Sequence, residues 1–282
     1  MTNVSEIAIL SSLHISQWEA RKYDKKISAK VAKDYGTDSK AGRYNKVLIA
    51  REALKAIQSE INGLRDYHKT MTVPWNHAED MLPVSRLEEY DIETEKRISN
   101  IEALADEFET NYPSYIEQAE IELNTMFDLA DYPPQDLIRS KFSVRIEKKP
   151  VPSAGDFRFK LANEKMEQLK ENLKKQNDLK LKNAMAELWN RLYEPVKHMA
   201  EVLATPDKNF HKTLISNITD VCNVLPDLNM VGDTDLEKLR QEILEKLTKY
   251  DSDELRLDVI SRKETANAAK GIMDKIERAI EF

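Results

Sequence analysis

The order of apolar and polar positions predicts a mainly helical chain with a few strands. Apolar and polar side chains alternate over residues 7–18, where Leu13 and Ile15 lie two apart, and this period of two predicts a strand. Over residues 47–68 the apolar side chains instead recur every three or four positions, which predicts a helix with one buried face.

Prolines divide the region that follows this helix. Pro74 and Pro83 predict a loop, with Trp75 buried beneath it. An acidic helix is predicted over residues 87–111, and Pro113 is expected in the first turn of a second acidic helix, where its missing N–H is harmless.

The clearest alternation in the chain predicts a hairpin over residues 141–161. Its first strand alternates Phe142, Val144 and Ile146 with polar residues, and the alternation resumes at Phe157 after a loop rich in proline. Because an isolated hairpin is only marginally stable in water, we expect the N-terminal strand to join it in a small antiparallel sheet.

The rest of the chain has the periodicity of helices. One long helix is predicted over residues 162–204, solvated around its polar middle and either kinked or restarted at Pro195. Three shorter helices are predicted to follow, two of which begin with a Ser/Thr-x-x-Glu capping box. The three helices are residues 210–225, 234–249 and 262–281, and the two boxes are Thr234 to Glu237 and Ser261 to Glu264.

These elements predict an α+β fold that is predominantly α-helical. We expect an α+β core over residues 1–204 and a C-terminal helical region over residues 205–282. The composition agrees, because hydrophobic residues make up 41% of the chain, charged residues make up 33%, and there are only 6 glycines. The long helices carry heptad-like faces, so we also expect a homo-oligomer.

Cysteine content and hydropathy favour a reducing compartment. The single cysteine, Cys222, cannot form an intramolecular disulfide, and no apolar run approaches the roughly 18 residues that span a bilayer. The N-terminus lacks a basic region and a small-residue cleavage site, so no signal peptide is expected. The sequence therefore predicts a cytoplasmic protein without membrane contact.

Charge is strongly segregated along the chain, whose net charge is −7. Residues 16–46 carry nine basic and four acidic side chains, and residues 139–160 carry seven basic and two acidic ones. Residues 86–131 reverse this balance with fourteen acidic and three basic side chains. We expect the two basic segments to meet on one sheet, and the acidic helices to repel nucleic acid elsewhere.

This arrangement predicts a nucleic-acid-binding surface, DNA or RNA. Its cations would bind phosphates and Tyr23 would stack on a base, whereas Trp18 closes the apolar strand pattern and is expected to anchor the core. The alternative interpretation is an ordinary set of solvated, edge-protecting charges. The residues assigned to the surface are Arg21, Lys22, Tyr23, Lys25, Lys26, Arg145, Lys148, Arg158 and Lys160.

No motif indicates catalysis, a metal or a cofactor. The chain contains no Walker A motif, dinucleotide fingerprint or HExxH, and the histidines and acids from residue 68 to 80 suit a solvated loop better than a metal site. Asp136, Glu147 and Lys149 resemble the Asp…Glu-x-Lys pattern of metal-dependent nucleases, in which carboxylates hold Mg²⁺. Such spacings arise easily by chance in a highly charged chain, so a nuclease is a remote alternative.

Several motifs are spread along residues 7–230: LHISQWEARKYDKK, GRYNK, TVPW, ADYP, KFSVRI, PVPSAGDFRFKL and ELWNRLYEPVKHMAEVL. Together they resemble a widespread family of uncharacterised tailed-bacteriophage proteins. The resemblance implies no catalytic residue. Genes of this family often lie near those for a MoxR-like AAA+ ATPase or phage recombination functions, which implies action in the host cytoplasm.

The sequence therefore favours a non-enzymatic phage protein that contacts nucleic acid through a basic sheet during phage DNA metabolism. The alternative is an interaction protein that captures a host factor, such as a defence enzyme, or serves as adaptor of an AAA+ ATPase. In that case the acidic helices would bind the partner through Glu102, Asp106 and Glu109.

Overall fold

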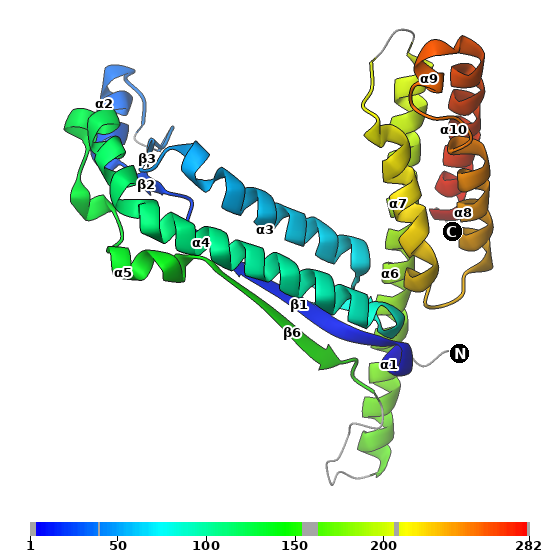
Figure 1. Ribbon diagram of the computed structural model, residues 1–282. Helices are drawn as coiled ribbons and strands as arrows, with labels where there is room; N and C mark the ends of the chain where they lie inside the picture. The colour runs from blue at the N-terminus through cyan, green and yellow to red at the C-terminus, as the bar shows by residue number, and fades with distance from the viewer. Residues whose placement is uncertain (1–3, 39, 154–162, 206–208, 281–282) are drawn as a thin grey trace. The chain divides into compact units, whose positions relative to one another are not determined.

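The computed structural model describes residues 4–38, 40–153, 163–205 and 209–280 (Figure 1). It confirms a predominantly helical α+β fold with one four-stranded and one two-stranded sheet. The chain divides into two compact units, a division that does not coincide with the expected boundary at residue 204. Unit 1 comprises Met1–Ser12, Tyr67–Tyr90 and Glu147–Phe282, and unit 2 comprises Leu13–Asp66 and Asp91–Ile146.

The four-stranded sheet has the order β4-β5-β1-β6. Strands β1 (Ala8–Ser16) and β6 (Ser143–Pro150) are neighbours, which confirms that the N-terminal strand pairs with the first strand of the expected hairpin. The expected second strand of that hairpin, at residues 157–161, lies outside the described residues. The other two strands are β5 (Asp80–Pro83), antiparallel to β1, and β4 (Val73–Pro74), antiparallel to β5.

The loop predicted between Pro74 and Pro83 is wrong, because this segment forms the hairpin of β4 and β5. The backbone N–H of Trp75 donates to the carbonyl of Glu79 at 3.0 Å, and Asn76 Oδ1 accepts from the N–H of Glu79 at 3.0 Å. Pro74 is compatible with pairing because β4 is an edge strand, where one ladder donor is dispensable. Trp75 is buried, as predicted.

Unit 1 is built around four helices that lie side by side in Figure 1. They are α6 (Asn163–Ala204), α7 (Thr213–Leu228), α8 (Thr234–Leu247) and α10 (Val259–Ile280). Helix α6 packs against α7 and α10, and α8 packs against the same two helices. Two four-residue helices, α1 (Val4–Ile7) and α9 (Glu254–Leu257), also belong to this unit.

Helix α6 is continuous through Pro195. Its buried face includes Leu188, Leu192, Val196 and Met199, whose three- and four-residue spacing runs without interruption across the proline. The polar middle of the helix, around residues 174–178, is largely exposed, as predicted.

Both capping-box predictions are wrong. Asp233 caps α8, since its carboxylate accepts from the N–H of Leu236 at 3.1 Å, and Thr234 is already the first helical residue. Asp258 does the same for α10 by accepting from the N–H of Ser261 at 3.3 Å. In both cases an aspartate, one residue before the predicted Thr234 and three before the predicted Ser261, satisfies free N–H groups of the first turn.

Unit 2 has a separate core between α3 (Arg51–Met71) and α4 (Leu87–Leu123), which lie side by side in Figure 1. Buried side chains of α3 in this core are Leu54, Ile57, Ile61 and Leu64, and those of α4 are Ile101, Ala105, Phe108, Tyr112 and Ala119. Helix α4 does not restart at Pro113, so the prediction of two acidic helices is wrong. Pro113 is exposed, and the buried face of α4 continues past it from Tyr112 to Ala119.

Trp18 belongs to this second core, as predicted. Its ring packs edge-on against Phe108 at a centroid distance of 6.3 Å and against Tyr112 at 5.9 Å. The rest of unit 2 includes α5 (Gln135–Ile138) and short 3₁₀ turns. Described 3₁₀ turns of the whole chain are Val84–Arg86, Asn124–Met126, Leu129–Asp131 and Arg139–Lys141.

Candidate nucleic-acid interface

The first basic segment folds as a β2–α2–β3 module within unit 2, residues 21–47. It consists of β2 (Arg21–Tyr23), α2 (Lys25–Asp34) and β3 (Asn45–Val47). Strands β2 and β3 are antiparallel and form a sheet of their own. The expectation that this segment shares a sheet with the second basic segment, on β6, is therefore wrong.

Local hydrogen bonds fix α2 to the two strands. The Asp24 carboxylate caps the helix by accepting from the N–H of Ile27 at 3.0 Å, and the Asp24 N–H donates to the carbonyl of Tyr44 at 2.9 Å. The Tyr44 N–H in turn donates to Ser28 Oγ at 2.9 Å. The helix ends at Asp34, and Gly36 just beyond it has a φ of 61°, a left-handed conformation that glycine adopts without strain.

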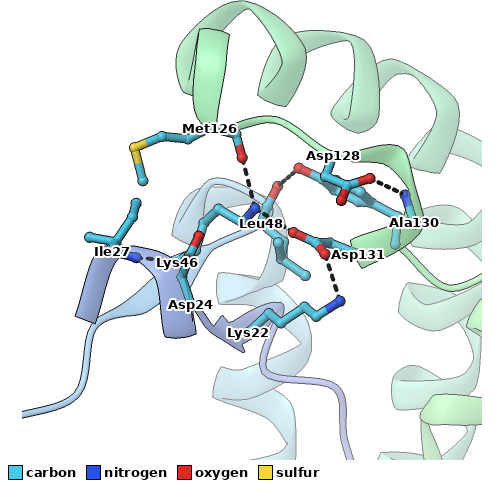
Figure 2. Close-up of polar contacts among 10 residues, drawn as sticks. Lys22, Asp24, Ile27, Lys46, Leu48, Met126, Asp128, Ala130 and Asp131 are labelled. Carbon is cyan, nitrogen blue, oxygen red and sulfur yellow. Dashed lines mark hydrogen bonds and ion pairs between the residues drawn. The ribbon is translucent and has the colours of Figure 1, made fainter. Parts of the chain in front are cut away.

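One face of the two-stranded sheet, here called the inner face, carries Lys22 and Lys46. Lys22 Nζ donates to Asp131 Oδ1 at 2.6 Å, while Lys46 pairs with Asp131 Oδ2 and donates to the carbonyl of Met126 at 2.7 Å (Figure 2). Lys46 is only 4% exposed. Lys22 is therefore less available to a phosphate than an unpaired lysine, because its ammonium group already engages the Asp131 carboxylate, which it shares with Lys46.

The titration of Asp131 reflects this pairing. Burial by itself raises the pKa of a carboxyl group, but the hydrogen bonds from Lys22 and Lys46 outweigh burial and hold the pKa of Asp131 below its ordinary value. The same hydrogen bond from Lys22 to Asp131 raises the pKa of Lys22. Both shifts favour the charged forms of Asp131 and Lys22.

The neighbouring tyrosine completes the attachment of the module. Tyr132 Oη donates to the carbonyl of Leu48 at 2.8 Å, and the N–H of Leu48 donates to the carbonyl of Ala20 at 2.7 Å. Burial, and then the negative charge of Asp131, raise the pKa of Tyr132 to about 12, so its hydroxyl remains a donor at neutral pH. The segment from Asp131 to Tyr132 thus holds both strands at their inner side.

The opposite side of the two-stranded sheet is here called the outer face. Side chains alternate across a strand, so Arg21, Tyr23, Asn45 and Val47 point away from Lys22 and Lys46, and all four are exposed. Arg43 joins this face, because its guanidinium lies 5.5 Å from the centroid of the Tyr23 ring. None of the residues that make up the outer face is acidic.

Helix α2 adds exposed lysines to the module, and Tyr35 and Tyr44 add exposed rings that are 80% and 40% accessible. Among the described residues, no ion pair engages these lysines or the two arginines of the outer face. The cations concerned are Arg21, Lys25, Lys26, Lys30, Lys33 and Arg43. The module therefore presents charge that the fold does not neutralise.

The remaining predicted phosphate ligands lie elsewhere. Arg145 and Lys148 are exposed on β6, in the four-stranded sheet. Arg158 and Lys160 lie outside the described residues. Of the residues predicted to bind nucleic acid, Arg21, Tyr23, Lys25 and Lys26 are thus exposed on the module, together with Arg43, Tyr35 and Tyr44, which were not predicted.

The predicted partner-binding acids lie on α4. Glu102 and Asp106 are exposed and Glu109 is half-buried. Asp106 also forms an ion pair with Arg139, which reduces its availability for a partner.

The residues of the pattern that resembles a nuclease are divided between the two units. Asp136 lies on α5 in unit 2, whereas Glu147 and Lys149 lie on β6 in unit 1, with Lys149 Nζ 3.6 Å from Glu147 and 3.5 Å from Glu79. Within the described ranges, no group of three or more His, Cys, Asp or Glu side chains is placed to hold a metal ion.

His68 is buried and hydrogen-bonded, whereas the sequence predicts a solvated loop for this region. It is 4% exposed, its Nδ1 lies 2.7 Å from Tyr90 Oη, and its Nε2 lies 2.9 Å from Asp80 Oδ2. Ser11 Oγ extends the chain of polar contacts at 3.4 Å from Tyr90 Oη. Both ring nitrogens of His68 are thus engaged by side chains of unit 1.

For the part of the chain that is described, no helix combines the length and apolar character needed to cross a membrane. Comparison of the chain with protein-family models, with curated proteins and with solved structures finds no match.

Proposed function

We propose that this protein binds nucleic acid through the outer face and helix α2 of the β2–α2–β3 module. It acts without catalysis, in the host cytoplasm, during phage DNA metabolism. The observation that carries the proposal is the gathering of unpaired, exposed cations around exposed tyrosine rings on one small module.

Unpaired cations favour this function for a physical reason. A lysine or arginine that binds a phosphate releases a condensed counterion, and this release supplies most of the affinity of non-specific nucleic-acid binding. A cation that already has a carboxylate partner contributes less, because that ion pair must be exchanged. Arg21 and the lysines of α2 are exposed and have no described carboxylate partner, whereas Lys22 is paired with Asp131.

The acidic residues of unit 2 limit where nucleic acid can bind. Exposed carboxylates on α4 include Glu95, Glu102, Asp106, Glu107, Glu117, Glu120 and Glu122. Their negative potential repels phosphates from that helix and leaves the β2–α2–β3 module as the favourable surface of this unit.

The test compares two neighbouring single-charge variants. Fluorescence anisotropy with a labelled oligonucleotide is measured over a salt series for the wild type, Arg21→Gln and Lys22→Gln. We expect Arg21→Gln to weaken binding and to reduce the slope of log affinity against log salt by about 0.7 to 0.9, the value for one phosphate contact. Lys22→Gln removes the same charge from the inner face and should change the slope much less.

Absence of binding by the wild type at about 50 mM salt would overturn the proposal, since electrostatic binding is strong at low salt. Equal effects of the two variants would also contradict it, because the outer face would then have no special role.

A second candidate function is capture of a basic protein partner by the exposed side of α4. The exposed acids of this helix lie together with two exposed isoleucines, Ile92 at 63% and Ile121 at 74% accessibility. At 100° per residue these two side chains project from the same side of the helix, which gives the acidic surface apolar ends. A host factor or an AAA+ ATPase with a basic surface would complement it.

This candidate is tested by affinity purification from infected cells, with nucleic acid analysed alongside protein. Reversal of charge in Glu102→Lys should remove a protein that the wild type retains, while Glu194→Lys, an exposed position on α6, should not. Retention of the same proteins by both variants would count against a partner surface on α4.

A further inference from the structure

We infer that the nucleic acid bound by the β2–α2–β3 module is single-stranded, and that one base stacks on the ring of Tyr23. The inference rests on the proposed nucleic-acid function and specifies the form of its ligand. Two buried tyrosines of unit 2 have hydrogen bonds that the fold explains, whereas Tyr23 is exposed and its described contact is with Arg43.

The contrast with those tyrosines is clear. Tyr112 and Tyr132 are buried, and their hydroxyls donate to the carbonyls of Pro133 at 3.0 Å and Leu48 at 2.8 Å. Tyr23 is 44% exposed, and the structure describes no hydrogen bond for its hydroxyl. Its ring is therefore available to a ligand without disturbing the core.

The surroundings of Tyr23 suit one nucleotide. Arg21 precedes it by two residues on the same face of β2, Asn45 lies opposite it on β3, and the guanidinium of Arg43 lies over its ring. A base on the exposed part of the ring would have arginines beside it for the adjoining phosphates and an amide for a base edge. This is the combination of aromatic stacking and cationic contact by which proteins hold single strands.

Duplex DNA should bind weakly to such a face. Its bases already stack on one another and present only their edges in the grooves, so a tyrosine ring finds no free base surface. Tyr35 and Tyr44 expose two more aromatic rings in the same module. Bases of a single strand are free to stack on these rings.

The inner face makes the platform rigid. Lys22 and Lys46 hold β2 and β3 to Asp131, so the positions of Arg21 and Tyr23 are fixed before the ligand arrives. A preformed face loses less conformational entropy on binding than a flexible one, which favours affinity.

The experiment measures anisotropy at low salt with three labelled oligonucleotides of one length: single-stranded DNA, single-stranded RNA and duplex DNA. We expect the wild type to bind a single strand at least about tenfold more tightly than the duplex. Tyr23→Ala should weaken single-strand binding about tenfold, within the range for loss of one stacked base, and should leave duplex binding unchanged. Tyr23→Phe keeps the ring and should retain the wild-type affinity.

The outcomes separate the inference from the function on which it rests. Equal or tighter binding of the duplex, or an unchanged single-strand affinity in Tyr23→Ala, overturns the inference. If Arg21→Gln still weakens binding in that case, the proposed function stands. Absence of binding to all three oligonucleotides overturns both. A thermal melt of Tyr23→Ala that matches the wild type shows that the variant is folded.

Discussion

Lys22 and Lys46 occupy opposed positions on β2 and β3, so two ammonium groups face the same side of a two-stranded sheet. Like charges at such a pair destabilise a sheet. Asp131 reverses the effect, because each of its carboxylate oxygens engages one of the two lysines. A carboxylate that lies 109 residues beyond Lys22 in the sequence thus stabilises the strand pair on which the proposed binding face is built.

Asp131→Asn should destabilise unit 2. The substitution leaves the buried ammonium of Lys46 without a charged partner, and removal of one member of a buried ion pair typically costs about 3 kcal/mol or more. Urea denaturation followed by tryptophan fluorescence measures the loss. Asp128→Asn is the matched control, since Asp128 is exposed and its side chain caps a turn by accepting from the N–H of Ala130. Equal losses in the two variants would contradict the role given to Asp131.

The stabilisation by Asp131 should also depend on pH. Its pKa in the folded protein lies below the ordinary aspartate value of 3.8, so its contribution is complete above that value and is lost as the pH falls through the lower folded pKa. We expect the urea midpoint of the wild type to fall between about pH 5 and pH 2 more steeply than that of Asp131→Asn. Parallel pH profiles for the two proteins would show that another group controls the acid transition.

The sequence predicts the elements whose burial follows a regular period. The strand at Leu13 and Ile15, the helix with Ile57 and Ile61, and the long helix over residues 162–204 are confirmed because apolar side chains recur along each at a regular period. The restart that Pro195 offered as one alternative does not occur, since the helix continues through it. Two predictions that relied on prolines are wrong: the loop between Pro74 and Pro83 and the restart of a helix at Pro113. Pro113 is exposed on α4 and Pro74 lies in an edge strand, and neither position shows in the local sequence.

The candidate site was less predictable for a related reason. The density of basic residues in the first segment is visible in the sequence, but which cations are neutralised depends on Asp131, a distant residue that no local pattern links to Lys22. The two faces of the sheet could not be predicted either. Tyr23 points outward and Lys22 inward only because β2 pairs with β3, and the local sequence of β2 does not identify that partner.

Asp233→Ala should destabilise unit 1 by about 1 to 2 kcal/mol, the usual effect of losing an N-cap side chain. Asp233 accepts from the N–H of Asp235 at 2.9 Å and also from Trp189 Nε1 at 3.2 Å, so both the helix start and its contact with α6 lose a partner. Thr234→Ala is the control, because Thr234 is exposed and does not cap the helix. A larger loss in Thr234→Ala would restore the capping box that the sequence predicts.

Cys222 offers a direct probe of the core of unit 1. The thiol is fully buried on α7, and burial raises its pKa from 9.0 to about 11, although the nearby charge of Arg240 acts in the opposite direction. Because the thiolate is the reactive form, iodoacetamide at pH 8 should label the native protein far more slowly than the urea-unfolded chain.

Labelling of Cys222 in the native protein requires opening of the helices around α7, and its rate follows the population of the open state. Since α8 packs on α7, Asp233→Ala should raise the labelling rate about 5- to 30-fold, the population change that corresponds to 1 to 2 kcal/mol, whereas Thr234→Ala should not. Rapid labelling of the native wild type, measured by mass spectrometry, would show that the packing around Cys222 opens more readily than its burial indicates.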